Sequence, residues 1–431
     1  MLNRSLFAKK PRFEYETVGS TPAEAESIPM PEKATFFLKK PLDGSAVLSL
    51  KVGDRVKTGQ KISPFPEGDA CIVSSVTGTV SSIAAYTGDY GQTCTAVTVA
   101  VEGEDDFDDS FGKAMDEGGV EAVKDYLACI PGAPSLELLS NPDSSIDTLV
   151  ICGVEKDLLV ATNQHVMKTN ITYMNAGISA LKKITGAHKT VIALPQSLMA
   201  DAGGLGGASG VELRVIDTVY PAWLPRMIMK DIIGKPVPAD KTCEDLGVCF
   251  ISAEAVAAVG MAVQERKMPV TKHLTLNGKN LEQRMVAARI GTPVSSVFSA
   301  FDIPLFDKDR IIVGGPMTGA AIFMEDHPVC PDTDALMIQA GADLPEVSDT
   351  PCINCGECVR ICPANIAVNM LVRFLEARQY EDAAEMYDLY SCVECGLCSY
   401  VCVSKIPIFQ YIRLGKYELD RIRKEEEAAD V

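Results

Sequence analysis

Two stretches of the chain repeat one cysteine spacing, and this repeat constrains the fold more than any other feature. Both follow C-x2-C-x2-C-x3-C, and Pro363 follows the first run. This is the bacterial spacing for [4Fe–4S] clusters, in which the fourth cysteine of a run ligates the other cluster. The sequence therefore predicts two [4Fe–4S] clusters. One is held by Cys352, Cys355, Cys358 and Cys402, and the other by Cys392, Cys395, Cys398 and Cys362.

Zinc is the alternative to these clusters, because closely spaced cysteines also bind zinc. A zinc site closes with four ligands, commonly in CxxC pairs, and does not need two copies of the longer run. The second run ends in Cys402-Val403 instead of Cys-Pro, but the proline is not a ligand. We therefore favour clusters, and expect Gly356 and Gly396 to let backbone N–H groups approach the cluster sulfurs.

The segment between the two runs, residues 365–388, has the apolar spacing of a helix. Its apolar positions are Ile366, Met370, Leu371, Phe374 and Leu375. The pattern predicts a C-terminal α-helical dicluster domain and not a compact β-rich ferredoxin.

Length and composition restrict the class of protein. At roughly 150 residues per domain, 431 residues predict about three domains. The net charge of −18 repels phosphate backbones, so we expect no nucleic-acid partner. No stretch approaches the roughly 18 apolar residues needed to span a bilayer, and the longest candidate, 256–263, contains Gly260. The N-terminus lacks the apolar core of a secretory signal, so we expect a cytoplasmic chain with no transmembrane segment of its own.

Seven cysteines lie outside the two runs. A reducing compartment disfavours disulfides, and a free cysteine behaves as a small hydrophobic residue. We therefore expect these to be buried thiols: Cys71, Cys94, Cys129, Cys152, Cys243, Cys249 and Cys330.

The remaining pattern predicts a multidomain α/β chain. Residues 1–35 are expected to form an extended arm over the first domain, 36–110 a β domain, and 115–262 a Rossmann-like α/β domain. Residues 268–330 return to β character, 340–418 hold the clusters, and 419–431 form a charged tail. Expected elements include a strand at 46–50 and one long helix over about 159–184, and the acidic run 102–109 is interpreted as a solvated linker.

The other motifs favour structural roles over chemistry. Residues 51–60 and 75–80 resemble the barrel-sandwich hybrid of biotinyl and lipoyl domains, but no Met-Lys pair precedes 75–80, which favours a scaffold. The glycine-rich stretch 202–210 lacks the third glycine of a dinucleotide loop and is expected to be a surface turn. Residues 314–319 are expected at an interdomain contact. The four histidines (His165, His188, His273 and His327) are expected to be isolated, and no catalytic residue is assigned.

Together these residues resemble the RnfC family, the peripheral dicluster subunit of Rnf ion-pumping ferredoxin:NAD oxidoreductases, with NqrA as a more distant relative. The resemblance covers about 40–418 and is carried by 390–402, Ile406-Pro407, Gln410-Tyr411, 289–293 and 314–319. It implies that 268–330 form an SLBB β-grasp domain. It also implies membrane subunits of an Rnf-like complex as partners, and a place on the cytoplasmic face of the inner membrane.

One departure from the family concerns its flavin and NADH site. The glycine-rich loop of the family should fall at 130–139, which here reads IPGAPSLELL. The acidic segment should fall at 152–159, where only Glu155 matches one of its carboxylates. A flavin normally bridges a two-electron hydride donor and one-electron clusters. We therefore expect the chain not to use FMN or NADH directly, with a surviving flavin site as the alternative.

The sequence predicts an electron-transfer subunit that exchanges single electrons with a ferredoxin or cytochrome partner within a membrane-associated complex. Two alternatives remain open. One is a soluble RnfC-like reductase that feeds a cytoplasmic enzyme, and the other is a non-redox scaffold whose clusters only hold the fold together.

Overall fold

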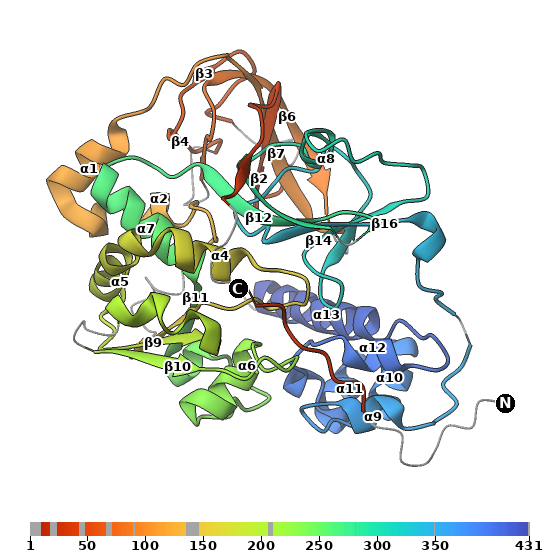
Figure 1. The fold of residues 1–431 in the computed structure, drawn as a ribbon. Helices are drawn as coiled ribbons and strands as arrows, with labels where there is room; N and C mark the ends of the chain where they lie inside the picture. Colours follow the sequence, from red (N-terminus) through yellow and green to blue (C-terminus); the bar gives the residue numbers. More distant parts are fainter. Residues whose placement is uncertain are drawn as a thin grey trace.

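The computed structural model describes residues 10–17, 24–42, 48–65, 71–88, 91–134, 146–205, 210–280, 282–348 and 350–429. Figure 1 shows a β-rich unit, an α/β unit, a second β-rich unit and a helical module, in chain order. The predicted class, a multidomain α/β chain, is confirmed. The boundaries between the predicted domains stay a prediction.

The first β unit is built on an antiparallel sheet in the order β2-β7-β6-β3. Side chains in β2 alternate between the interior and the surface, and Phe36 and Leu38 pack on Val97 and Val99. Residues 48–50 of the expected strand 46–50 are not a strand, and 46–47 lie outside the described residues. The strands are β2 (Lys33–Leu38), β3 (Arg55–Val56), β4 (Lys61–Ile62), β5 (Ile72–Val73), β6 (Gly78–Thr87) and β7 (Thr93–Val101).

The α/β unit contains a four-stranded parallel sheet in the order β10-β9-β8-β11. Its strands are β8 (Thr148–Cys152), β9 (Lys189–Leu194), β10 (Val211–Val215) and β11 (Val248–Ser252). The helices are α1 (Ser110–Gly118), α2 (Lys124–Leu127), α4 (Thr162–Thr169), α5 (Ile171–Thr185), α6 (Pro225–Ile228) and α7 (Ala253–Glu265). The single long helix expected over 159–184 is therefore two helices, since Asn170 has non-helical dihedral angles.

Helices α5 and α7 pack backbone against backbone. A Cβ atom at Gly177 would collide with the carbonyl of Val256, and one at Gly260 with the carbonyl of Tyr173. The apolar stretch 256–263 lies in α7, where most of its residues are buried in the core of this unit. Among the described residues, no helix combines the length and apolar character that a membrane span requires.

The second β unit is a mixed sheet in the order β1-β13-β12-β16-β14-β15, with helix α8 (Val294–Ser299) beside it. Its strands are β1 (Glu26–Ser27), β12 (Thr271–Asn277), β13 (Gln283–Arg289), β14 (Arg310–Val313), β15 (Ala320–Ile322) and β16 (Ala335–Gln339). The sheet therefore extends beyond the predicted range 268–330, because β1 and β16 belong to it.

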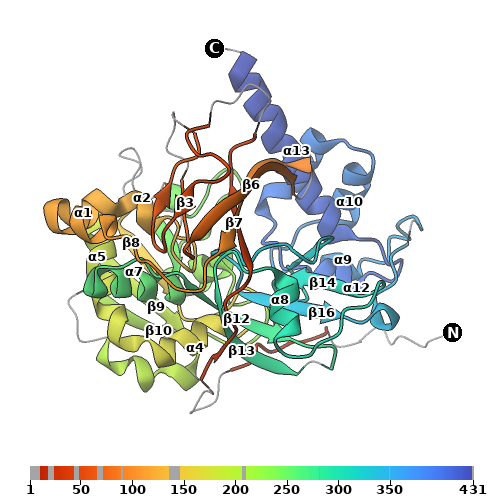
Figure 2. The same ribbon diagram turned by 90° about the horizontal axis from the view of Figure 1, so that it is seen from above.

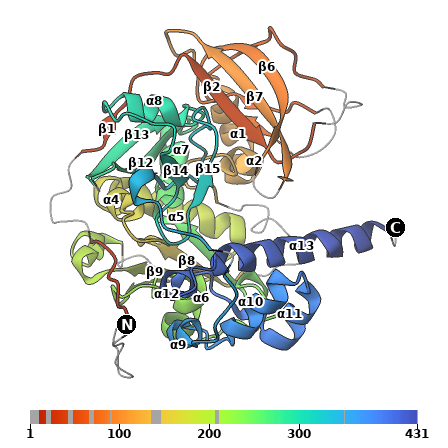
Figure 3. The same ribbon diagram turned by 90° about the vertical axis from the view of Figure 1, so that its right-hand side faces the viewer.

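The C-terminal module is helical, as the spacing of 365–388 predicts. Helix α10 buries Val368, Leu371, Val372 and Leu375 along one face. The module comprises α9 (Glu357–Ile361), α10 (Val368–Glu376), α11 (Tyr380–Tyr387), α12 (Leu397–Val401) and α13 (Ile408–Ala429). The predicted tail 419–431 continues α13 as far as Ala429, and Figures 2 and 3 show this helix projecting from the body of the protein.

The N-terminal arm takes a different course from the one expected. Instead of lying over the first β domain, it brings Phe13 against Tyr400 of the helical module and stacks Tyr15 on Trp223 of the α/β unit. Farther along, β1 pairs with β13 of the second sheet. The expectation is wrong because aromatic side chains of the arm find their partners in units that are distant in the sequence.

The acidic run 102–109 is also more than a solvated linker. Asp105 forms an ion pair with Arg289 of β13 and accepts a hydrogen bond from Thr58. Asp106 pairs with Arg55 and Lys57 of the first β unit. The run therefore connects the two β units by charge pairing, and the linker interpretation is wrong for these two residues.

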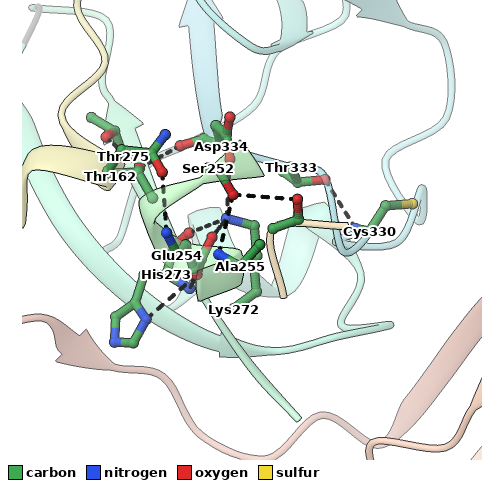
Figure 4. Close-up of polar contacts among 12 residues, drawn as sticks. Thr162, Ser252, Glu254, Ala255, Lys272, His273, Thr275, Cys330, Thr333 and Asp334 are labelled. Carbon is green, nitrogen blue, oxygen red and sulfur yellow. Dashed lines mark hydrogen bonds and ion pairs between the residues drawn. The ribbon is translucent and has the colours of Figure 1, made fainter. Parts of the chain in front are cut away.

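A buried ion pair joins the second sheet to the α/β unit (Figure 4). Lys272 of β12 donates to the Glu254 carboxylate at the start of α7, and the two side chains are 0% and 3% exposed. Lys272 also donates to the backbone oxygen of His273 at 2.6 Å and reaches Asp334 at 3.3 Å. The contacts compensate both charges for their loss of water.

Replacing Lys272 by Met should destabilise the chain by about 3–5 kcal/mol, because Glu254 is left as an unpaired buried charge. The matched control is Lys33→Met, which removes the exposed ion pair with Asp326 and should cost less than about 1 kcal/mol. Both values are measured as free energies of unfolding in urea by far-ultraviolet circular dichroism. Equal losses would contradict the role assigned to the buried pair.

Candidate metal centre

The two cysteine runs form loops of the same backbone shape. Asn354 and Glu394 occupy matching positions with φ of 57° and 56°, and Gly356 and Gly396 have φ of 77° and 70°. Helices α9 and α12 begin directly after these glycines and pack against each other. The module therefore has two equivalent loops, each followed by a short helix that ends at the fourth cysteine of its run.

The first cysteine set surrounds one cavity. Cys352, Cys355, Cys358 and Cys402 all line it, together with Ile406. Cys402 comes from the second run and stands at the C-terminal end of α12, whereas the other three belong to the first run. The structure thus brings together the four residues that the exchange of the fourth cysteine predicts for one cluster.

The second set lies deeper in the protein. Burial raises the pKa of Cys395 to about 12, and the nearby charges of Cys392 and Cys362 add to this rise. Burial also raises the pKa of Cys398 well above its ordinary value, again with Cys392, Cys395 and Cys362 contributing. The four sulfurs of this set therefore lie within range of one another's charge. Thiols buried in this way ionise when a metal supplies the positive charge, so the donor set fits a metal cluster.

Backbone N–H groups face the sulfurs of the second run. The N–H of Glu394 donates to the sulfur of Cys392 at 3.4 Å. The N–H groups of Leu397 and Ser399 lower the pKa of Cys395 and Cys398, against the larger effect of burial. The expected approach of backbone amides to the sulfurs is therefore seen at this loop, where it stabilises thiolates.

The two sets differ in their access to solvent. Cys355 is exposed, and Ile353, two residues before it, is 64% exposed. Cys395 and Cys398 are buried, and the backbone oxygen of Cys395 accepts a hydrogen bond from the Tyr220 hydroxyl at 2.7 Å. We call the Cys352 set the outer set and the Cys392 set the inner set.

An aromatic cluster connects the inner set to the α/β unit. Tyr15 of the arm stacks on Trp223 with ring centroids 3.9 Å apart, and the ring of Tyr220 lies 5.2 Å from that of Tyr15. Burial raises the pKa of both tyrosines, so they stay neutral. Sequence reasoning did not find this cluster, because the arm that supplies Tyr15 lies more than 200 positions from the other two residues along the chain.

The turn at 314–319 forms the interdomain contact that the sequence predicts. The Asp157 carboxylate accepts hydrogen bonds from the N–H groups of Met317 and Thr318 and from the Thr318 hydroxyl. On its other side, the carbonyl of Met317 lies where a Cβ atom of Gly396 would be. The turn therefore holds the inner loop against the α/β unit. Asp157, which carries the contact, had no signal in the sequence.

The place of the family's flavin loop lies partly outside the described residues, at 135–139. Gly132 donates from its N–H to the carbonyl of Pro331 at 2.7 Å, and a Cβ atom here would lie 2.6 Å from the nitrogen of Ala255. Residues 130–134 thus pack closely on the start of α7. The glycine-rich stretch 202–210 falls partly outside the described residues too, at 206–209.

Glu155, the one acidic residue matched to the family's site, is fully buried. Its two carboxylate oxygens accept hydrogen bonds from the backbone N–H and the side-chain amide of Gln164, at 3.0 and 2.8 Å. Burial raises its pKa to about 7, the charge of Asp334 adds to the rise, and the bonds from Gln164 oppose it. The carboxyl is therefore partly protonated near neutral pH.

Two other expectations need correction. His165 and His273 are not isolated from each other, because their rings lie 6.1 Å apart. Of the seven cysteines outside the runs, Cys249 is buried and the other six are half-buried. Within the described part of the chain, no three His, Cys, Asp or Glu side chains converge on one metal-ion position. A [4Fe–4S] cluster distributes its four cysteines over four irons, so its ligands need not converge in this way.

Two protein-family models match the N-terminal and C-terminal parts of the chain. A family model described as "RnfC Barrel sandwich hybrid domain" matches residues 14–104. A second, described as "4Fe-4S dicluster domain", matches residues 351–406. The predicted barrel-sandwich domain and the predicted pair of [4Fe–4S] clusters are confirmed. The assignment of individual cysteines to each cluster stays a prediction.

Curated relatives cover nearly the whole chain. The RnfC component of the ion-translocating oxidoreductase complex from Klebsiella pneumoniae (strain 342) is 29% identical over 418 residues, 93% of this chain and 55% of that protein. The predicted resemblance to the RnfC family is confirmed. The same component from Pseudomonas aeruginosa is 29% identical over 94% of this chain and 54% of its own length. The same component from Pectobacterium atrosepticum is 27% identical over 95% of this chain and 61% of its own length.

This RnfC-like chain spans about half the length of the curated relatives it matches. Among solved structures, an NAD+-reducing [NiFe]-hydrogenase in the air-oxidized state covers 70% of this chain and 65% of its own at 13% identity, with a TM-score of 0.45. The resemblance to the RnfC family rests on the sequence relatives and the two family models.

Gly396→Ala should weaken the retention of the inner cluster more than Gly356→Ala weakens that of the outer one. Both substitutions impose about 1–2 kcal/mol for a left-handed backbone. At Gly356, the nearest atom to a new Cβ is 4.0 Å away, whereas at Gly396 the Cβ collides with Met317. The measurement is iron and sulfide per chain after anaerobic reconstitution and gel filtration. Equal iron content in the two variants would contradict the prediction.

The raised pKa of Glu155 predicts a pH dependence of stability. The folded chain binds this proton up to about pH 7, whereas the ordinary pKa is 4.5. The contribution of the protonated Glu155 to the free energy of unfolding is therefore complete below pH 4.5 and is lost as pH rises to about 7. The largest loss is on the order of 3 kcal/mol.

Glu155→Gln should remove this part of the pH dependence. The measurement is urea unfolding of wild type, Glu155→Gln and the exposed control Glu346→Gln between about pH 5.5 and 8.5. We expect the control to follow wild type and Glu155→Gln to decline less. The same decline in all three proteins would show that Glu155 does not titrate in this range.

Proposed function

We propose that this chain is an iron–sulfur electron-transfer subunit, similar to RnfC, in a membrane-associated complex that couples electron transport to ion translocation. The observation that carries the proposal is the placement of two cysteine sets at different depths in one helical module. The outer set reaches the surface at Cys355, whereas Cys395 and Cys398 of the inner set are buried, and Cys395 accepts a hydrogen bond from Tyr220 of the α/β unit. The relatives, which are components of ion-translocating oxidoreductase complexes, support this assignment.

The eight cysteines of the runs are the proposed ligands. Cys352, Cys355, Cys358 and Cys402 would hold one cluster, and Cys392, Cys395, Cys398 and Cys362 the other. When bound, each [4Fe–4S] cluster accepts and releases one electron at a time. The role of the chain is to hold the two sets side by side, to bury Cys395 and Cys398 of the inner set, and to supply backbone N–H groups to the sulfurs of that set.

The outer set is the proposed point of contact with an electron partner. Ile353 and Val403, which line the outer cavity, are 64% and 38% exposed. A ferredoxin, a cytochrome or another protein of the complex could approach Cys355 there. Membrane subunits would hold the chain on the cytoplasmic face of the inner membrane.

Direct use of NADH and FMN is not part of the proposal. The segment 130–139 has one glycine, Gly132, whose surroundings leave no space for a side chain. The single matching acid, Glu155, already has both oxygens engaged by Gln164. These features support electron exchange with a protein, and not with a nicotinamide.

The test is the anaerobic addition of NADH to cluster-loaded protein, followed by visible absorption, with dithionite as the positive control. We expect bleaching by dithionite and none by NADH. NADH gives up two electrons as a hydride, each cluster accepts one electron, and no set of described residues takes the place of the flavin that normally connects the two. Rapid bleaching by NADH, or a bound flavin in anaerobically isolated protein, would contradict this part of the proposal. Clusters that dithionite cannot cycle would favour a purely structural role for them.

A second measurement distinguishes the membrane-associated subunit from a soluble reductase. Cell extracts are fractionated by ultracentrifugation and the chain is detected by immunoblotting. The proposal predicts co-sedimentation with membranes and its loss when the membrane subunits are deleted. Recovery in the soluble fraction under both conditions would favour the reductase.

A further inference from the structure

Two cysteines outside the cluster runs meet where the first β unit joins the α/β unit. Cys71 directly precedes β5, and Cys129 follows α2. Both sulfurs donate to the same acceptor, the carbonyl of Asp125, at 3.9 and 3.8 Å. The sulfur of Cys129 also donates to the carbonyl of Cys71 at 3.6 Å, and a side-chain hydrogen bond joins the two thiols. The pair is therefore positioned for direct reaction.

A lysine provides positive charge beside this pair. The Lys61 ammonium lies 2.7 Å from the Asp125 carboxylate and 5.5 Å from the ring centroid of Tyr126. Burial lowers the pKa of Lys61, but the bond to Asp125 and the nearby charge of Cys71 outweigh this, and the net pKa is raised. A cation next to a thiol favours the thiolate, which is the reactive form.

The thiol of Cys129 is held in its neutral form by its surroundings. Both residues are half-buried, but a hydrogen bond with Cys71, followed by burial, raises the pKa of Cys129 well above its ordinary value. Any reaction that consumes the Cys71 thiol removes that hydrogen bond. In the proposed order Cys71, which lies beside the Lys61–Asp125 ion pair, reacts first and Cys129 reacts second.

Two other thiols of the chain lack this arrangement. Cys249 and Cys330 donate to the carbonyls of Phe250 and Pro328, which are near them in the sequence. Burial raises the pKa of Cys249 to about 12. These two residues behave as structural thiols and serve as internal controls.

We propose that Cys71 and Cys129 form a reversible disulfide that covalently ties the first β unit to the α/β unit. The oxidant is a low-molecular-weight disulfide of the glutathione type. The link joins positions 58 residues apart and fixes β5 to the end of α2. The proposal is independent of the electron-transfer function and of the clusters.

The reaction is a two-step thiol–disulfide exchange with an external disulfide RSSR. The Cys71 thiolate attacks one sulfur of RSSR, which forms Cys71–S–S–R and releases RS⁻. The Cys129 thiolate then attacks the Cys71 sulfur, which forms the bond between the two residues and releases the second RS⁻. The protein thiols lose two protons and two electrons, and RSSR becomes two RSH.

The experiment uses the full, cluster-loaded chain under anaerobic conditions, incubated with mixtures of oxidised and reduced glutathione. Samples are quenched in acid, blocked with N-ethylmaleimide and analysed by peptide mass spectrometry. We expect a linked Cys71–Cys129 peptide about 2 Da lighter than the sum of its two reduced peptides. Dithiothreitol should reverse the link, while the visible cluster absorption stays unchanged.

Variants make the assignment specific. Cys71→Ser and Cys129→Ser should each abolish the linked peptide, whereas Cys330→Ser should leave it at wild-type level. Lys61→Met should slow formation of the link by roughly tenfold or more, because it removes the positive charge beside the Cys71 thiol. Recovery of Cys71 and Cys129 as separately blocked thiols, or as separate glutathione adducts at equilibrium, would overturn the proposal.

Discussion

The contact at the 314–319 turn determines where the cysteine module sits. Asp157 accepts hydrogen bonds from Met317 and Thr318 and so fixes the turn to the α/β unit. The carbonyl of Met317 then meets Gly396, the glycine of the inner loop, where a side chain would collide. Backbone geometry on both sides therefore sets the distance between the inner cysteines and the α/β unit, and the outer set is left at the surface.

Two buried carboxyl groups of the α/β unit, those of Glu254 and Glu155, are stabilised in different ways. Glu254 is compensated by Lys272, which comes from another unit, so the pair stays charged and joins the two units. Glu155 receives only neutral donors from Gln164, and its pKa rises to about 7. The difference follows from the cost of removing a carboxylate from water, which a cation offsets more fully than an amide does.

Local pattern was enough to predict much of the fold. The repeated cysteine spacing specified the dicluster module, the helical spacing of 365–388 specified its α-helices, and the pattern of 115–262 indicated an α/β unit. Two of the predictions that were wrong, one long helix over 159–184 and a solvated linker at 102–109, each have an identifiable cause. Asn170 interrupts a helical pattern that is otherwise continuous, and Asp105 is acidic like its neighbours although it pairs with a distant arginine.

The sequence by itself determined which residues can carry the chemistry, because the spacing of thiols along a loop is a property of the chain. Only the tertiary structure decided that the aromatic cluster of Tyr15, Trp223 and Tyr220 meets the inner set at Cys395, and that Cys71 lies against Cys129. These contacts join positions 58 to more than 200 residues apart. No local periodicity encodes them, because they depend on how the packed units meet and on the burial that this packing creates.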